Sequence, residues 1–159
     1  MRLIFTVFLS VLLVDSYAQT SDKDQIMKVV NNVFDAMRSN DSTLLKACFV
    51  EEPTTFTVSR REGKTNFVRD NFQGFIDAVG SPKKEMWNEP IWNEKVQIDD
   101  DLASVWVDYA FYRGKEGDQF SHCGVDAFHL VRLDGIWKIF HLVDTRRKEG
   151  CEVPDTIKP

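Results

Sequence analysis

The stretch SHCGVDAFHLVRLDGIWKIFHLVDTRR, residues 121–147, decides the fold class of this chain. Apolar and aromatic residues fill both of its halves, and Asp134-Gly135 stands between them. An Asp-Gly pair between two such runs is a strong signal for a two-residue hairpin turn. We therefore expect paired strands at 119–132 and 136–146.

The segments before this hairpin continue the same pattern. Strands are expected at 86–98 and 102–113, because short polar links join each run to the next. Short links between successive strands imply an antiparallel meander.

Residues nearer the N-terminus favour helices. From Ser21 to Met37, apolar residues recur at steps of three and four, which predicts an amphipathic helix. A short helix is expected to start at Ser42, a strand to cover 54–60, and a third helix to be capped by Thr65. Helices followed by an antiparallel meander indicate an α+β fold, with the helices covering one face of a curved sheet.

The turn at Asp134-Gly135 also predicts which side chains share a face. Counting outward from it, Phe128 lies opposite His141, and Asp126 lies opposite Val143. Directly opposed residues of an antiparallel pair point to the same face. His141 and Asp126 are therefore expected on one face of the sheet.

The neighbouring hairpins extend that face. A four-residue loop at GKEG places Tyr109 opposite His122, and the turn near Asp99 adds Glu94 and Trp92. The face is otherwise apolar and would line a ligand pocket. Its candidate ligand-binding residues are Trp92, Glu94, Tyr109, His122, Asp126, Phe128 and His141.

The opposite face is also apolar for an outer surface. It carries Trp106, Ala110, Cys123 and Val125. An exposed apolar patch of this size usually meets another chain. We therefore expect a homodimer through the outer sheet face.

The N-terminus is typical of an exported protein. Residues 1–18 combine Arg2, an apolar run and small residues ending at Ala18, which predicts a signal peptide cut after Ala18. The run is too short to span a bilayer, so a secreted or periplasmic location without membrane attachment is expected. The net charge of −5 does not favour nucleic-acid binding.

Three cysteines follow the predicted leader: Cys48, Cys123 and Cys151. An oxidising compartment favours one disulfide and one free thiol. The predicted strand register brings Cys123 near Arg146, five residues before Cys151, so we expect Cys123–Cys151. The alternative pairs Cys48 with Cys151.

The motifs WVDYAFY at 106–112, HCGVDAFHLVR at 122–132 and GIWKIFHLVDTRR at 135–147 resemble the nuclear transport factor 2-like (NTF2-like) superfamily. More narrowly, they are similar to secreted bacterial proteins grouped as putative lumazine-binding, SnoaL-like domains. The resemblance implies one domain over 19–151, followed by a tail at 152–159. It also implies a cone-shaped antiparallel sheet wrapped around three helices, an internal pocket and frequent dimers. Superfamily members include isomerases, dehydratases, cyclases and binding modules, so the fold does not choose an activity.

Small-molecule binding is the expected function, with a hydrophobic or aromatic ligand and no cofactor. The alternative is an acid–base enzyme (isomerase, dehydratase or cyclase) that uses Asp126, His122, His141 and Tyr109, since burial moves carboxyl and imidazole pKa values toward neutrality. A third hypothesis is an interaction module with a filled cavity. A metal site is not expected, because four residues of strand separate His122 from Asp126 by about 13 Å.

Overall fold

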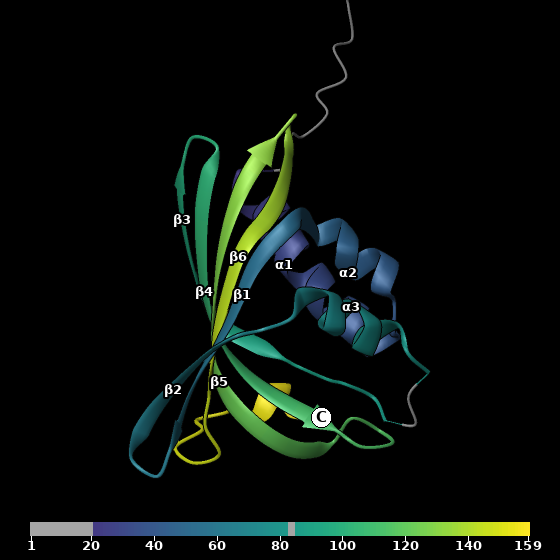
Figure 1. Cartoon of the computed structure of the whole chain (residues 1–159), viewed down its shortest axis with the longest axis vertical. Coiled ribbons are helices and arrows are strands. Elements are labelled where there is room, and N and C mark those ends of the chain that lie inside the picture. The colour runs from purple at the N-terminus through teal and green to yellow at the C-terminus, as the bar shows by residue number, and fades with distance from the viewer. Residues whose placement is uncertain (1–20, 83–84) are drawn as a thin grey trace, which may run out of the picture.

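The computed structural model describes residues 21–82 and 85–159 (Figure 1). The predicted signal peptide, residues 1–18, lies outside the described residues. None of the helices in the described ranges is long and apolar enough to cross a membrane. The elements are α1 Asp22–Ser39, α2 Ser42–Cys48, β1 Phe49–Arg61, β2 Lys64–Arg69, α3 Phe72–Gly80, β3 Ile91–Asp99, β4 Leu102–Arg113, β5 Gln119–Leu133, β6 Ile136–Arg146 and the short 3-10 helix η1 Asp155–Ile157.

The six strands form one curved sheet in the order β2-β1-β6-β5-β4-β3. Strands β3 to β6 make the predicted antiparallel meander. Strand β1 was not expected beside it, yet β1 pairs with β6 in parallel and with β2 in an antiparallel hairpin. Figure 1 shows the three helices together on one side of the sheet, as the α+β prediction required.

Strand β2 replaces the start of the predicted third helix. Glu62 and Gly63 both have positive φ angles, of 50° and 77°, and turn β1 back on itself as a hairpin. Phe67 is therefore a strand residue that is 64% exposed and stacks on Phe56, with 4.8 Å between ring centroids. Helix α3 starts later, where the Asn71 side chain accepts a hydrogen bond from the backbone N–H of Gly74.

The core lies between the helices and the concave face of the sheet. Phe34 of α1 meets Phe128 of β5 edge to face, with 6.1 Å between ring centroids. Burial of these apolar side chains is the main stabilising contribution, at roughly 25 cal/mol for each Å² removed from water. Fully buried members include Ile26, Val30, Leu45, Val79, Val107, Leu130 and Ile139.

Irregular positions in the sheet decide which residues face the core. Phe140 is an extra residue in β6, because Ile139 pairs with Leu130 while His141 already pairs with His129. Such a bulge exchanges the faces of every residue beyond it. The predicted pairs of Phe128 with His141 and Asp126 with Val143 are therefore wrong. The observed partners are Leu142 for Phe128 and Asp144 for Asp126.

A second bulge lies in β3. Trp92 pairs with Asp108 and Lys95 with Trp106, so Asn93 and Glu94 stand against a single residue of β4. Asn93 has a φ of 55°, and its side-chain nitrogen donates to Asp108 Oδ2 at 2.8 Å. Trp92 is consequently turned to the outer face of the sheet.

Candidate functional site

A cavity of about 250 Å³ lies between α1, α3 and the concave sheet face. Both the helices and the sheet contribute apolar residues to its wall, so the helices close the side of the cavity that the sheet leaves open. The apolar lining is Val33, Phe34, Met37, Phe56, Phe75, Phe128 and Leu142. The polar lining is Thr55, Asp70, Asn71, Glu89, Tyr109, His122, Asp126, Asp144 and Arg146.

Asp126 is the most buried acid of this lining, with 4% of its surface exposed. It stands on β5 opposite Val107 of β4 and Asp144 of β6. Within residues 21–82 and 85–159, no protein group donates a hydrogen bond to its carboxyl. Burial raises the pKa of Asp126 well above its ordinary value, and the nearby charges of Glu89 and Asp144 raise it further.

Glu89 faces the same cavity from the segment that leads into β3. The chain is fixed there because Asn88 bridges to the backbone of Tyr112 and accepts a hydrogen bond from Arg38 of α1, at 2.9 Å. Burial, then the charge of Asp144, raises the pKa of Glu89 to about 8. Glu89 is therefore mostly protonated at neutral pH, and burial favours the protonated form of Asp126 as well. A protonated carboxyl can donate a hydrogen bond.

Asp144 is the acid of the site that forms an ion pair. Arg146 Nε lies 2.6 Å from Asp144 Oδ2, and the Thr57 hydroxyl lies 2.6 Å from Asp144 Oδ1. That hydroxyl also lies 2.9 Å from Asp70 Oδ2, and its single proton can go to only one of the two acids. Burial lowers the pKa of Arg146, but hydrogen bonding and charge from Asp144 outweigh it, and the net shift is upward.

Tyr109 joins this network from β4. Its hydroxyl donates to the carbonyl oxygen of Thr145 at 2.9 Å and lies 3.4 Å from Asp144 Oδ2. Burial, then the charge of Glu89, raises the pKa of the Tyr109 phenol. Tyr109 therefore stays neutral and keeps its proton over the physiological pH range.

His122 lies at the mouth of the cavity. Its ring centroid is 5.7 Å from that of Tyr109 and 5.2 Å from that of Phe111, and its Nδ1 is 3.1 Å from the Ser121 hydroxyl. Burial, then the positive charge of Arg146, lowers the pKa of His122 to about 4. The imidazole is therefore neutral at pH 7.

Tyr109, His122, Asp126 and Phe128 meet at the cavity, as the sequence predicted. The loop after β4 and a bulge between Phe111 and Tyr112 each shift the predicted register by one residue, so that Tyr109 opposes Gly124 instead of His122. A shift by two keeps every side chain on its predicted face, whereas a shift by one reverses it.

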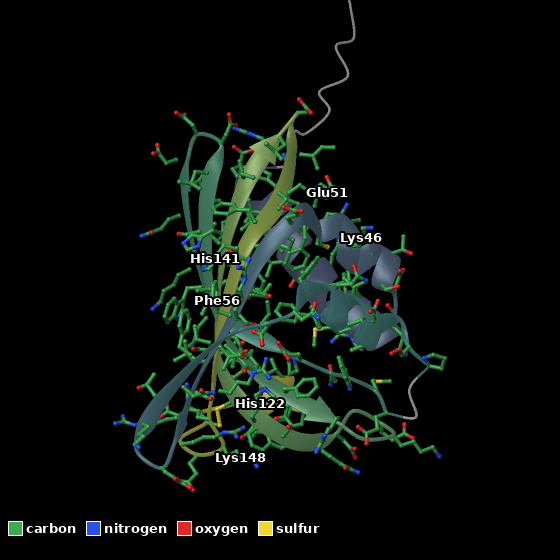
Figure 2. The ribbon with its side chains drawn as sticks, in the orientation of Figure 1. Lys46, Glu51, Phe56, His122, His141 and Lys148 are labelled. Carbon is green, nitrogen blue, oxygen red and sulfur yellow. A yellow bond between two sulfur atoms is a disulfide. The ribbon has the colours of Figure 1, made fainter. Side chains whose placement is uncertain are left out.

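His141 is not part of the cavity, and its predicted place there is wrong. The bulge at Phe140 turns it to the outer face, where it stacks on His129 with 5.3 Å between ring centroids. Its Nδ1 lies 2.7 Å from the Thr54 hydroxyl, and Figure 2 shows it beside Phe56, away from His122. Burial, then the nearby His129, lowers the pKa of His141.

Trp92 and Glu94 are also misplaced by the prediction. The bulge at Asn93 directs Trp92 to the outer face, where it packs against Ala110 and Tyr112. Glu94 is exposed beside Trp106 on that face. Three acids of the cavity lining were not predicted: Asp70, Glu89 and Asp144. Asp144 was missed because a bulge cannot be read from strand alternation.

The disulfide Cys123–Cys151 is present, with 5.9 Å between the two Cα atoms, and confirms the preferred pairing. Cys123 exchanges two backbone hydrogen bonds with Arg147, which brings the chain after β6 within reach. Cys48 is a buried free thiol, and burial raises its pKa to about 11. A disulfide is compatible with an oxidising compartment.

The raised pKa of Glu89 predicts that stability falls as pH rises. The folded state holds this proton up to about pH 8, whereas an unfolded chain releases it near its ordinary value of 4.5. The contribution of the neutral acid is complete below about pH 4.5 and is lost between there and pH 8. Urea unfolding across this window should show the decline, and Glu89→Gln should flatten it. Glu94→Gln, on the exposed face, is the matched control, and an equal flattening there would contradict the assignment.

Comparison with known proteins places the fold. The model of a family described as putative lumazine-binding matches residues 21–143. Among solved structures, an NTF2-like protein of unknown function from Shewanella baltica has a TM-score of 0.61 at 17% identity, covering 82% of this chain and 100% of that one. An NTF2-like protein from Cytophaga hutchinsonii has a TM-score of 0.64 at 16% identity, covering 80% and 100%. A protein of unknown function with a cystatin-like fold, from Nostoc punctiforme, has a TM-score of 0.61 at 13% identity, covering 80% and 92%.

These identities are low, so the likeness to solved structures establishes the NTF2-like fold alone. No curated protein matches the chain.

Proposed function

The chain belongs to the putative lumazine-binding family of NTF2-like domains, and on that premise we propose that its cavity binds the uncharged, partly apolar part of a small molecule. The observation that carries the proposal is the Asp126 carboxyl, which is buried, faces the cavity and lacks a donor or acceptor among the described residues. A ligand in the cavity can form the hydrogen bond that the described residues do not provide.

The chemistry of the lining selects the kind of ligand. Burial favours the protonated forms of Glu89 and Asp126, which present hydrogen-bond donors to the cavity, while Phe34, Phe75 and Phe128 present apolar surface. A flat ring system with carbonyl or ring-nitrogen acceptors fits both features. The family description points to lumazine-type heteroaromatics, which have such acceptors.

Charged ligands fit the interior poorly. Arg146 already pairs with Asp144, so an anion placed deeper would face Glu89, Asp126 and Asp144 in a desolvated space. The acid–base enzyme stays a prediction, because the described residues do not identify a substrate with a proton to transfer.

A cavity-filling substitution tests the proposal with the neutral dye N-phenyl-1-naphthylamine, whose fluorescence rises in an apolar site. Wild-type protein should bind the dye, and Leu142→Phe should weaken binding at least about tenfold, since the larger ring occupies the cavity. Val143→Phe is the matched control, because Val143 is the next residue of β6 and points to the opposite face.

Circular dichroism should first establish that both variants are folded. Equal weakening in the two variants, or no binding to the wild type, would contradict the proposal.

The homodimer through the outer sheet face stays a prediction, and it is independent of ligand binding in the cavity. Trp106 is 49% exposed there, and the stacked His129 and His141 rings extend the same surface. An apolar surface of this kind favours a second copy of the chain. Sedimentation equilibrium should give a dimer for the wild type and a monomer for Trp106→Glu, with Lys28→Glu on α1 as the control. A monomeric wild type would rule the dimer out.

A further inference from the structure

A second depression opens beside the cavity mouth, between the β1–β2 hairpin and the segment that follows β6. Figure 1 shows this hairpin and the yellow C-terminal segment at the same end of the sheet, and Figure 2 labels Lys148 and His122 there. The depression encloses about 800 Å³ and is open to solvent. We call it the basic groove. Its charged lining is Arg60, Arg61, Asp70, Arg146, Arg147, Lys148 and Glu149.

The basic groove has the opposite charge to the rest of the molecule. Five basic and two acidic side chains line it, whereas the whole chain has a net charge of −5. Arg61, Arg147 and Lys148 form no ion pair with any acid of the described residues. Unpaired cations gathered on one surface create a positive potential that attracts an anion.

The basic groove and the cavity adjoin. Asp70, His122 and Arg146 line both of them. Arg146 is half exposed, and its guanidinium contacts Asp144, which is 13% exposed, at the boundary. A molecule lying in the cavity therefore reaches the groove without crossing an apolar barrier.

The cavity and the basic groove differ in the charge of their linings. The cavity holds the acids Glu89, Asp126 and Asp144, whose burial disfavours a further negative charge. The groove holds cations exposed to water, where an anion keeps part of its hydration. An anionic group of a ligand is therefore stable in the groove and unstable in the cavity.

We propose that the ligand carries an anionic group, a phosphate, sulfate or carboxylate, that lies in the basic groove while its uncharged ring occupies the cavity. This inference rests on the proposed function of the cavity. It assigns the ligand an orientation, with its polar end toward Arg61, Arg147 and Lys148. It also predicts that salt weakens binding of the anionic ligand, since exposed charges are screened within about 8–10 Å at physiological ionic strength.

Two dyes that share one ring system test the inference. N-phenyl-1-naphthylamine is neutral, and 8-anilinonaphthalene-1-sulfonate is the same ring system with a sulfonate. The triple variant Arg61→Gln, Arg147→Gln, Lys148→Gln should bind the sulfonate about tenfold more weakly than the wild type, since three attractive charges are removed from the groove. Its affinity for the neutral dye should change less than about twofold.

The control variant Lys23→Gln, Lys28→Gln, Lys115→Gln removes the same charge from exposed positions outside the groove. Its affinities for the two dyes should stay within about twofold of the wild type. This control separates the effect of the groove cations from the effect of the protein's net charge. If the groove variant binds the sulfonate as well as the wild type does, the inference is overturned and the cavity proposal stands.

Two other outcomes are also decisive. If the groove variant binds neither dye, Arg61, Arg147 and Lys148 maintain the cavity and do not hold an anion. This result would overturn the inference. If neither dye binds the wild-type protein, the cavity proposal fails, and the inference fails with it.

Discussion

Replacing Gly124 by alanine is expected to lower the free energy of unfolding by roughly 3 kcal/mol. A Cβ at this position would lie 1.7 Å from the carbonyl oxygen of Thr145 and 2.8 Å from Cε1 of Tyr109. Since the first of these atoms belongs to the backbone of β6, a side-chain rotation cannot relieve the clash. The two strands must separate, and the Tyr109–Thr145 hydrogen bond at 2.9 Å would be disturbed.

Urea unfolding followed by circular dichroism measures this effect. Gly74→Ala is the matched control, because Gly74 lies in α3 and an added Cβ would have only ordinary contacts with the Asn71 side chain, from 3.4 Å. Alanine is favoured over glycine in helices, so the control should be unchanged or more stable by about 0.5–1 kcal/mol. A Gly124→Ala protein as stable as the wild type would show that β5 and β6 do not approach this closely.

Removing the disulfide is expected to have an effect of similar size. The bond Cys123–Cys151 closes a loop with a sequence separation of 28. Loop-closure entropy in the unfolded chain then predicts a loss of about 3.5 kcal/mol in the free energy of unfolding for the double variant Cys123→Ser, Cys151→Ser. The bond also ties the C-terminal segment to β5, beside the basic groove.

Dithiothreitol provides the test and its control. The reductant should destabilise the wild type by about the same 3.5 kcal/mol and leave the double variant unchanged. Cys48→Ala retains the bond, so this variant should respond to dithiothreitol as the wild type does. A double variant that remains sensitive to the reductant would contradict the assignment.

The sequence predicted those features that depend on local pattern. Strands β4, β5 and β6 and the tight turn at Asp134-Gly135 follow from runs of strand residues around turn signals. The predicted face of Tyr109, His122 and Asp126 was correct because two one-residue shifts, in the loop after β4 and at the bulge beside Phe111, add up to two.

The rest depends on tertiary structure. The extra residue Phe140 moves Asp144 into the cavity and His141 out of it, and a bulge leaves no mark in the alternation of apolar residues. Glu89 reaches the cavity because Asn88 bridges to Tyr112, a contact between distant segments. Strand β2 was read as helix because Phe67 was grouped with the apolar residues of the following helix, although it stacks on Phe56.

Methyl NMR of isotope-labelled protein titrated with N-phenyl-1-naphthylamine tests the central claim most directly, because it locates the ligand. The claim is that the cavity between the helices and the concave face is the binding site. We expect the largest shift changes at the methyl groups of Val33, Met37 and Leu142, which line the cavity. Val125 and Val143 are on the outer face and should change little. Changes confined to those two valines, with the cavity methyl groups unaltered, would contradict the account.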